Sequence, residues 1–517
     1  MRVTNRMMTT NALNNINRNK RNMSVKENQY ATGYKIQRPS EDPVVAVRSL
    51  KYRTQLTELT QYVDKNIPDA FSWMDITESA LDNINEILTQ MNAYCNQGAN
   101  GTLETYDRES IIETLQQYKE HIADMSNTDY AGRYVFTGYK TDVPMLFTEP
   151  ETDYVYTINE SFKFTDITAA SYVKGGARYT VGNDADDYAG DAPTLETAQK
   201  IKLTYKNTDG NNEDTTATPP VQAVLPTITL KDANGNPMIV TGSNGTITNP
   251  PEYPAIRMVS LSEPGGACYN AGPDEIIYVK ETGELILGES YYKAAQNSAS
   301  IDVTYEKSRF EKDDIRPEHY FECTAENVIT GEKIHYASPD VQKIQYEVNF
   351  SQMLTVNTLA KDAIPTNIIS KIDELILNVE QVFDLDTKLA EVNKLIETEQ
   401  NKENLEALQE LKDQLTTEQT LKKKVLQNTF ASGITVTQKA EEKVNIAMSN
   451  HGSRYLRLQL TEARLQDQQT DFKEMLDNND LIDIEDAIIN YKSAETVYNA
   501  SLSCAATVVK NTLLDFL

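Results

Sequence analysis

The side chains that usually perform catalysis are few in this sequence, and their spacing does not match catalytic motifs. The four histidines form neither an H-x-x-x-H nor an H-E-x-x-H pattern: His121, His319, His335 and His451. No serine-nucleophile, phosphate-loop or dinucleotide-binding motif occurs either. These residues therefore predict a protein that is not an enzyme and that holds no cofactor.

One acidic segment has the composition of a metal site. In "GNDADDYAGDAP", the carboxylates of Asp184, Asp186 and Asp187 are spaced as in a calcium loop. The segment lacks the glycine and the closing glutamate that such a loop requires. We interpret it as an acidic surface turn and predict no metal site.

The four cysteines lie far apart and form no C-x-x-C pair: Cys95, Cys268, Cys323 and Cys504. This spacing fits neither a disulfide framework nor a metal site. We expect buried or idle thiols, and the small neighbours of Cys504 indicate that it is packed in a helix.

Charge and hydropathy exclude two classes of partner. The formal net charge of the 517 residues is −28, so the chain lacks the basic footprint of proteins that bind nucleic acids or anionic membranes. No apolar run reaches the eighteen residues of a membrane span. The opening "MRVTNRMMTTNALNNINRNKRN" has no apolar core and is not a Sec-type signal peptide. We expect a cytosolic protein, or one exported without a cleaved signal.

Both ends of the sequence have helical periodicity. After Asp480, which we expect to be the N-cap, apolar residues recur every three or four positions: Leu481, Ile484, Ile488, Tyr491, Tyr498, Leu502, Ala505 and Val509. A weaker stripe near the N-terminus comprises Leu13, Ile16, Met23 and Tyr30. These stripes predict two terminal helices with a coiled-coil-like seam.

Further helices are expected next to the terminal ones. A stripe from Ala70 through Trp73 to Tyr94 ends at Gly98. Pro43 suits a helix start capped by Asp42, and Pro68 is expected to bend or interrupt its helix. Leu458, Leu465 and Phe472 follow a strict seven-residue spacing, which favours pairing with the earlier helices.

The middle of the chain, about residues 141–345, has β-like texture. "ITLKDANGNPMIV" and "EIIYVKETGELILG" predict hairpins that turn at Asn234-Gly235 and Thr282-Gly283. The charged stretch 385–425 predicts a solvated helical hairpin.

These patterns together predict an α+β fold. We expect an elongated antiparallel helical bundle formed by both termini, with an inserted β-rich outer domain whose ends lie close together. The predicted division is 1–45 with 480–517, 46–140 with 346–479, and 141–345.

The last residues are unusually apolar: Leu513, Leu514, Phe516 and Leu517. Burying four such side chains contributes about 6–12 kcal/mol at most, at about 1.5–3 kcal/mol each. The tail could fold back on its own bundle or be buried between copies. Because the polar gaps in the Leu13–Tyr30 stripe leave apolar surface uncovered, an interaction between copies is favoured.

Several motifs resemble those of the hook–filament junction proteins of the flagellin superfamily. They are the start Met1–Thr4, the turn Thr32-Gly33 to Ile36, and "PSEDPVVA" from Pro39 to Ala46. "NQGANGT" followed by "GRYVFTGYKT" is similar to the end of the N-terminal helical region. "HGSRYLRLQ", in which His451 replaces the usual apolar residue, and the closing "YNASLSCAATVVKNTLLDFL" are similar to the C-terminal region of this family.

The resemblance implies a non-enzymatic structural adaptor that joins the flagellar hook to the flagellin filament. Implied partners are other copies in a ring or helical layer, the hook-side junction protein, flagellin and a flagellar export chaperone. The resemblance also implies type III export and terminal helices that are disordered until assembly. We expect the Leu13–Tyr30 stripe, the seam after Asp480 and the apolar tail to carry assembly.

Two alternatives remain open at this point. The chain could be an atypical flagellin that forms the filament itself. It could also be an extracellular binding or adhesion protein that acts through the β-rich module.

Overall fold

The structure is a computed structural model of the chain. It describes residues 5–101, 103, 105–176, 179, 191–208, 224–241, 247–248, 256–339, 342–398 and 402–514. The acidic segment with Asp184, Asp186 and Asp187 lies outside these residues, so its interpretation as a surface turn stays a prediction.

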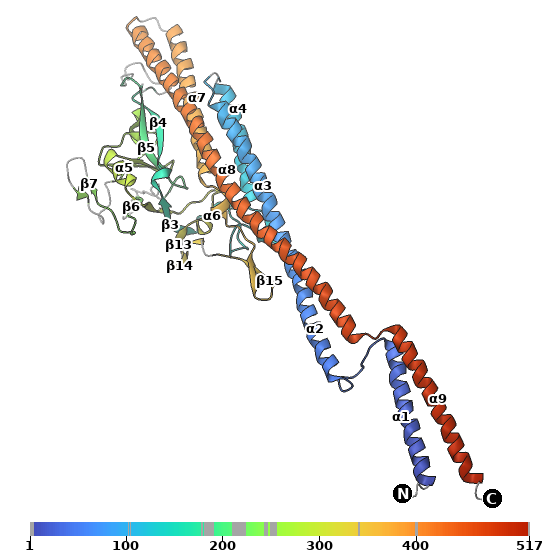
Figure 1. Ribbon diagram of the computed structural model, residues 1–517. Helices are drawn as coiled ribbons and strands as arrows, with labels where there is room; N and C mark the ends of the chain where they lie inside the picture. Colours follow the sequence, from blue (N-terminus) through green and yellow to red (C-terminus); the bar gives the residue numbers. More distant parts are fainter. Residues whose placement is uncertain are drawn as a thin grey trace. The chain divides into compact units, whose positions relative to one another are not determined.

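Long helices occupy both ends of the chain and strands occupy its middle, which confirms the predicted α+β class (Figure 1). The helices are α1 (Asn5–Thr32), α2 (Pro43–Gln61), the π-helical turn η1 (Tyr62–Asn66), α3 (Ile67–Gly98), α4 (Thr105–Ser126), α5 (Glu289–Gln296), α6 (Ala360–Ala363), α7 (Asn367–Thr398), α8 (Lys402–Asp480) and α9 (Ile484–Leu514).

The strands run from residue 129 to residue 355. They are β1 (Asp129–Tyr130), β2 (Arg133–Tyr134), β3 (Tyr154–Phe162), β4 (Thr168–Lys174), β5 (Thr194–Lys202), β6 (Thr227–Lys231), β7 (Val240–Thr241), β8 (Ile247–Thr248), β9 (Ile256–Val259), β10 (Ile276–Val279), β11 (Glu284–Leu287), β12 (Ser300–Lys307), β13 (Glu322–Asn327), β14 (Lys333–Tyr336), β15 (Gln345–Asn349) and β16 (Gln352–Thr355).

The chain divides into two compact units, and each is described by itself. Unit 1 comprises Met1–Phe71, Tyr346–Leu354 and Tyr455–Leu517, and unit 2 comprises Ser72–Gln345 and Thr355–Arg454. The division of the chain into three predicted domains stays a prediction.

In unit 1, α2 pairs in antiparallel fashion with the C-terminal part of α8. The seven-residue pattern predicted for α8 forms the seam, since Leu458 and Leu465 are fully buried and Phe472 contacts Tyr52 with ring centroids 6.2 Å apart. The side chain of Asp42 accepts hydrogen bonds from the backbone N–H groups of the first turn of α2, as the sequence predicts.

A π-helical turn between α2 and α3 interrupts the α-helix next to Pro68, which is one of the two outcomes predicted there. The Ile67 N–H donates to the Tyr62 carbonyl, five residues back, instead of the usual four. Pro68 has no N–H to continue the α-helical ladder, so the helix accommodates it by widening one turn.

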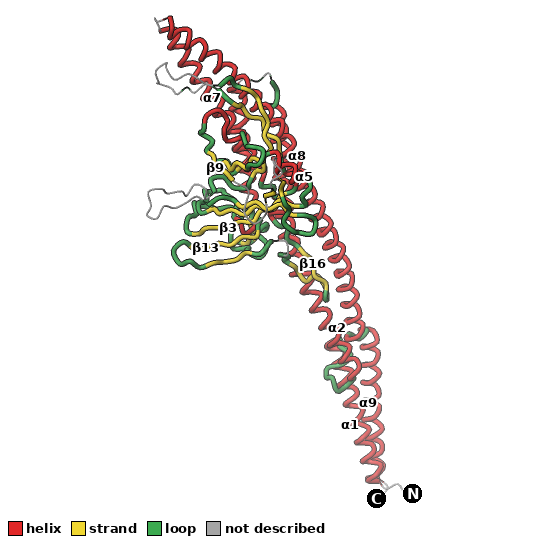
Figure 2. The backbone as a smooth tube through the Cα atoms, turned by 90° about the vertical axis from the view of Figure 1, so that its left-hand side faces the viewer, coloured by secondary structure: helices red, strands yellow, loops and turns green. Residues whose placement is uncertain are grey.

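The other helix pair of unit 1 consists of α1 and α9, which lie side by side in both views (Figures 1 and 2). The pair is antiparallel, because Tyr30 near the end of α1 stacks on Tyr491 near the start of α9, with centroids 6.0 Å apart. This confirms that the terminal helices pack together.

A short backbone connection joins the two helix pairs of unit 1. The Lys35 N–H donates to the Asp480 carbonyl at 2.8 Å, and the Ile482 N–H donates to the Gly33 carbonyl at 2.8 Å. Gly33 ends α1 with a φ of +75°, a left-handed conformation that glycine adopts without strain. The predicted Thr32-Gly33 turn is thereby confirmed.

In unit 2, α3, α4, α7 and α8 provide the helical part. Most of the predicted stripe on α3 is buried, including the fully buried Trp73 and Ile84, and α3 ends at Gly98 as predicted. The charged stretch forms a helical hairpin of α7 and α8, whose apolar faces meet through Val392, Leu411 and Leu415.

The strands of unit 2 form two five-stranded sheets within the described residues. The first sheet has the order β4-β5-β11-β10-β9, and only its β9–β10 pair is parallel. The second sheet has the order β14-β13-β3-β12-β6. The hairpin predicted at Thr282-Gly283 is confirmed by the β10–β11 pairing. At Asn234-Gly235 the chain also turns back, and Lys231 pairs with Pro237.

The two ends of the predicted β-rich segment, about residues 141–345, meet at one place, as predicted. The Tyr139 N–H donates to Gln342 Oε1 at 3.0 Å.

Two sequence predictions are wrong. The N-cap of the last helix is Asp483, whose side chain accepts from the Glu485 N–H at 2.8 Å, and Asp480 instead ends α8. Cys504 is exposed, whereas Cys95, Cys268 and Cys323 are buried thiols as expected. The small residues around Cys504 pack against α1 on another face of the helix.

Candidate functional site

Helix α9 has two different apolar faces. The face toward α1 carries small residues and tyrosines, all of them buried or half-buried: Ala487, Tyr491, Ala494, Tyr498, Ser501 and Ala505. The larger aliphatic side chains lie on the remaining surface, where Ile484 and Ile489 are 66% and 65% exposed. Among the described residues of unit 1, α1 is the helix along which α9 packs. The most apolar residues of α9 therefore lie outside its contact with α1.

The matching seam of α1 is partly polar. Its half-buried positions include Ala12, Ile16, Asn19, Met23 and Lys26. Asparagine and lysine at seam positions of a coiled coil lower its stability. A two-helix seam of this composition holds the pair together weakly.

The predicted assembly residues fall into three groups. Ile16, Met23, Tyr491 and Tyr498 lie in the α1–α9 seam, and Tyr30 joins it through its ring stack. Leu13, Leu481, Ile484, Ile488 and Leu502 are exposed. The side chains of Val509, Leu513 and Leu514 and all of Phe516 and Leu517 lie outside the described residues.

The sequence stripes missed part of the exposed apolar surface of unit 1. Further large side chains are exposed at Val44, Val47 and Leu50 on α2, at Leu456 and Leu460 on α8, and at Ile489 and Val497 on α9. The signal that could have found them is an excess of apolar residues outside the seven-residue stripe, as in "PVVAVRSL". Most of the exposed large apolar residues in the described chain belong to unit 1.

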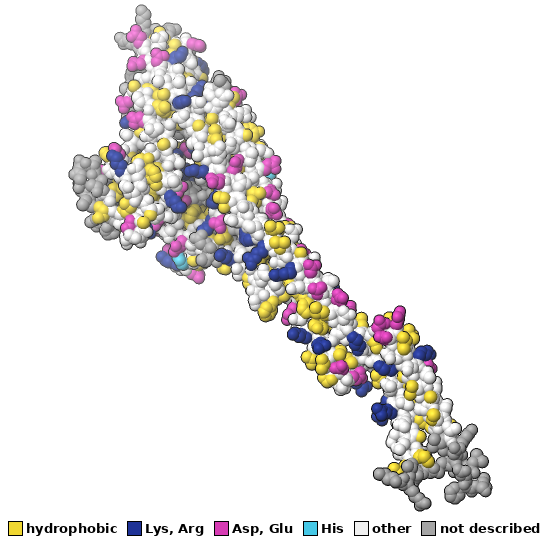
Figure 3. Space-filling model, viewed as in Figure 1, with side chains coloured by type: hydrophobic (Ala, Val, Ile, Leu, Met, Phe, Trp, Pro, Cys, Tyr) yellow, Lys and Arg dark blue, Asp and Glu magenta, His cyan; other side chains and the backbone are white. Residues whose placement is uncertain are grey.

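Charge is distributed unevenly over the α1–α9 pair. Arg18, Lys20 and Arg21 are exposed on α1, whereas Glu485 and Asp486 are exposed in the first turn of α9. Figure 3 shows one side of this pair, on which yellow apolar and dark blue basic side chains are both exposed.

Asp480 fixes the connection between the two helix pairs. Its nearly buried carboxylate accepts from Arg53 Nη2 and Ser49 Oγ, both at 2.8 Å, and from Asn479 Nδ2 at 2.9 Å. Burial opposes ionisation, but these hydrogen bonds hold the pKa of Asp480 below its ordinary value.

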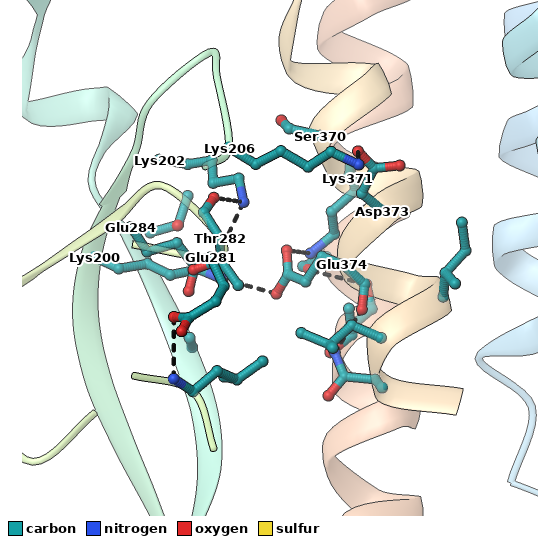
Figure 4. Close-up of a pocket in the computed structure, with 18 of the residues that line it drawn as sticks. Lys200, Lys202, Lys206, Glu281, Thr282, Glu284, Ser370, Lys371, Asp373 and Glu374 are labelled. Atoms are coloured by element: carbon teal, nitrogen blue, oxygen red, sulfur yellow. Dashed lines mark hydrogen bonds and ion pairs between the residues drawn. The ribbon is translucent and has the colours of Figure 1, made fainter. Parts of the chain in front are cut away.

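Unit 2 contains a cavity of about 1630 Å³ between the β4–β5–β11 sheet and helices α7 and α8. In Figure 4, Lys200 of β5 and Glu374 of α7 point toward each other across it. Lys200 Nζ lies 2.7 Å from Glu284 Oε1 and 2.9 Å from Glu374 Oε1, and Lys371 Nζ lies 2.9 Å from Glu374 Oε2.

The charges of this cluster neutralise one another. Burial alone would lower the pKa of Lys200, but Glu284 and Glu374 raise it, and Lys200 in turn lowers the pKa of both carboxyls. The cluster therefore ties the sheet to α7, and no unpaired lysine in it is available to attract a charged ligand.

Two other kinds of site are absent from the described residues. No described helix is long and apolar enough to cross a membrane. No described group of histidine, cysteine, aspartate or glutamate side chains has the arrangement needed to hold a metal ion.

The N-terminal region is similar to proteins of a known family. Residues 3–141 match the family model of the bacterial flagellin N-terminal helical region. The chain is 27% identical over 145 residues to flagellar hook-associated protein 3 of Salmonella typhimurium, covering 28% of this chain and 45% of that protein. It is 31% identical over 128 residues to a flagellin of Clostridium tyrobutyricum, covering 25% and 34%.

The chain thus spans less than half the length of these curated relatives. Among solved structures, FlgL of Xanthomonas campestris covers 82% of this chain with 98% of its own, at 10% identity and a TM-score of 0.32. The flagellar hook-associated protein 3 of Legionella pneumophila covers 83% with 97% of its own, at 13% identity and a TM-score of 0.28. Structural similarity at this level supports no conclusion about function.

The matched region contains α1, α2, α3 and α4, so the family covers the helices that open the chain. The part of this chain that is similar to the bacterial flagellin N-terminal helical region is therefore residues 3–141.

Proposed function

We propose that this chain is a structural component of the bacterial flagellum that joins the hook to the flagellin filament. Its partners are further copies of itself, a hook-side junction protein and the first flagellin subunits, and a flagellar export chaperone escorts it. The similarity to flagellar hook-associated protein 3 supports this role. The export of the chain without a cleaved signal peptide belongs to the same proposal.

The observation that carries the proposal is the exposed aliphatic face of α9. Ile484, Ile488, Ile489 and Leu502 are exposed on a helix whose seam with α1 is built from smaller side chains. Large apolar side chains left exposed on one helix in this number mark an interaction site. Head-to-tail contacts between identical subunits generate rings or open helical layers, which a junction requires.

The test is electron microscopy of a strain that lacks this protein. We expect intact hooks, no attached filaments and flagellin shed into the medium. Expression of the full chain should restore attachment, whereas Ile484→Asp with Ile489→Asp should not, because each substitution buries a charge in the contact. Ser503→Asp, at an exposed position of α9 that carries no large apolar group, is the control. Normal filaments in the deletion strain would refute the proposal.

The match to a flagellin supports a second candidate, in which the chain forms the filament itself. Copy number separates the two roles. A filament subunit should be present in great excess over the hook protein and should polymerise alone, whereas a junction component should be confined to a short layer.

A further inference from the structure

We propose that neighbouring copies of this chain dock through opposite charges on α1 and α9, with an axial offset of about 22 Å. The basic face of α1 in one copy lies beside the acidic, isoleucine-rich start of α9 in the next copy. This inference rests on the proposed function and specifies the contact between copies.

The basic face of α1 has no ionic partner among the described residues. Arg18 and Arg21 are exposed three residues apart, and neither forms an ion pair with another described residue. The exposed Val25 lies seven residues from Arg18 and four from Arg21, so it shares their side of the helix, and this surface offers both charge and apolar area. Lys20, two residues from Arg18, lies on another side of α1 and does not belong to this face.

The start of α9 offers the complementary surface. Glu485 and Asp486 are exposed, and they lie in the sequence between the exposed Ile484 and the exposed pair Ile488 and Ile489. Acidic residues in a first turn also interact favourably with the helix dipole, and this effect explains why Glu485 and Asp486 occur there. The dipole does not account for the three exposed isoleucines or for the basic face of α1.

The register of the pair keeps these two surfaces apart in one molecule. Tyr30 lies beside Tyr491, and the helices are antiparallel, so Arg21 lies level with about residue 500. That level is about fifteen residues, or about 22 Å at 1.5 Å per residue, from Glu485 and Asp486. The charges are therefore too distant to pair within one copy.

A second copy with the same orientation, shifted by this distance along the helix axis, brings the two surfaces level. Because the shift has a direction, each copy uses its α1 face toward one neighbour and its α9 face toward the other. Such a contact repeats without closing on itself.

Charge reversal tests the pairing in the strain that lacks the native protein. One variant carries Arg18→Glu and Arg21→Glu, a second carries Glu485→Lys and Asp486→Lys, and a third carries all four substitutions. We expect each of the first two to reduce the number of attached filaments at least tenfold and the third to restore them. Circular dichroism of the purified variants checks that each one folds.

The outcomes separate this inference from the proposed function. If the parent chain fails to restore attachment, the proposed function and this inference both fail. If the parent restores attachment and the reversed variants do so equally well, or if the variant with all four substitutions stays as defective as the others, only the charge pairing is overturned.

Cysteine cross-linking measures the offset directly. On a Cys504→Ser background, Arg21→Cys with Glu485→Cys should give disulfide-linked dimers and larger species from oxidised, isolated flagella. A disulfide requires Cα atoms about 4.4–6.8 Å apart, so a bond between these positions must join different copies. As the control, Arg21→Cys with Thr496→Cys places the second thiol at another level of α9 and should give no ladder. A ladder from the control alone would overturn the offset.

Discussion

Arg53 of α2 donates a hydrogen bond to Asp480 at the end of α8 across 2.8 Å, although the two residues are 427 positions apart in the sequence. Asp480→Ala removes the acceptor of Arg53, Ser49 and Asn479 together. We expect it to lower the stability of unit 1 by about 1–3 kcal/mol, as measured by hydrogen exchange of the α2 amides. Asp477→Ala, at an exposed position one turn earlier, should change it by less than about 0.5 kcal/mol.

The same carboxylate makes the connection sensitive to acid. Because the pKa of Asp480 is depressed in the folded protein, its contribution is complete above the ordinary value of 3.8 and is lost as the pH falls through the folded pKa. The Asp480→Ala variant should lack this part of the acid transition.

Two leucines of α8 provide a matched test of the α2–α8 seam. Leu465 is fully buried, whereas Leu460 is 65% exposed. Leu465→Ala should destabilise unit 1 by about 2–4 kcal/mol, because it removes buried apolar volume, and Leu460→Ala should have an effect within about 0.5 kcal/mol. Chemical denaturation followed by circular dichroism measures both. Equal effects would contradict the seam.

The buried ion cluster of unit 2 should be intolerant of losing one member. Lys200→Met leaves the carboxylates of Glu284 and Glu374 without their shared cation, and we expect a loss of about 3–5 kcal/mol. Lys293→Met breaks an exposed pair with Glu289 and should cost less than about 0.5 kcal/mol. Thermal unfolding of both variants checks this. A Lys200→Met protein as stable as the parent would show that the cluster contributes nothing.

His451 should contribute to acid sensitivity at a higher pH. Burial lowers the pKa of His451 to about 4, from an ordinary value of 6.5. The unfolded chain therefore binds a proton before the folded one does, so stability is full above about pH 6.5 and falls between there and pH 4. The difference corresponds to about 3 kcal/mol. His451→Leu should remove this slope from the pH dependence of unfolding, whereas His335→Gln, at an exposed site, should leave it unchanged.

The polar seam of the α1–α9 pair can be strengthened. Asn19→Leu with Lys26→Leu places apolar side chains at two half-buried seam positions. Hydrogen exchange in the free protein should show at least tenfold slower exchange of the α1 and α9 amides than in the parent. Arg18→Leu with Lys20→Leu, which adds the same residue type outside the seam, should not slow this exchange.

Much of the helical architecture follows from the sequence, because a seven-residue stripe such as Leu458, Leu465 and Phe472 has only one way to be buried. The sequence does not predict which stripe residues of α9 contact α1 and which are exposed. Tyr491 and Ile488 belong to one periodic stripe, yet only the tyrosine lies in the seam, since the partner face of α1 accommodates small side chains and rings. The order of the strands in the two sheets was also beyond prediction, because short alternating runs do not specify their neighbours.

The hydrogen bond that the Tyr139 N–H donates to Gln342 Oε1 closes the segment of about residues 141–345 at its base. Because the chain enters and leaves this segment at a single point, residues can be inserted, deleted or replaced within it without altering the spacing of the helices around it. Closing a longer loop adds little entropy cost. Natural variation in this protein should therefore accumulate beyond that point, while the helical frame keeps its dimensions.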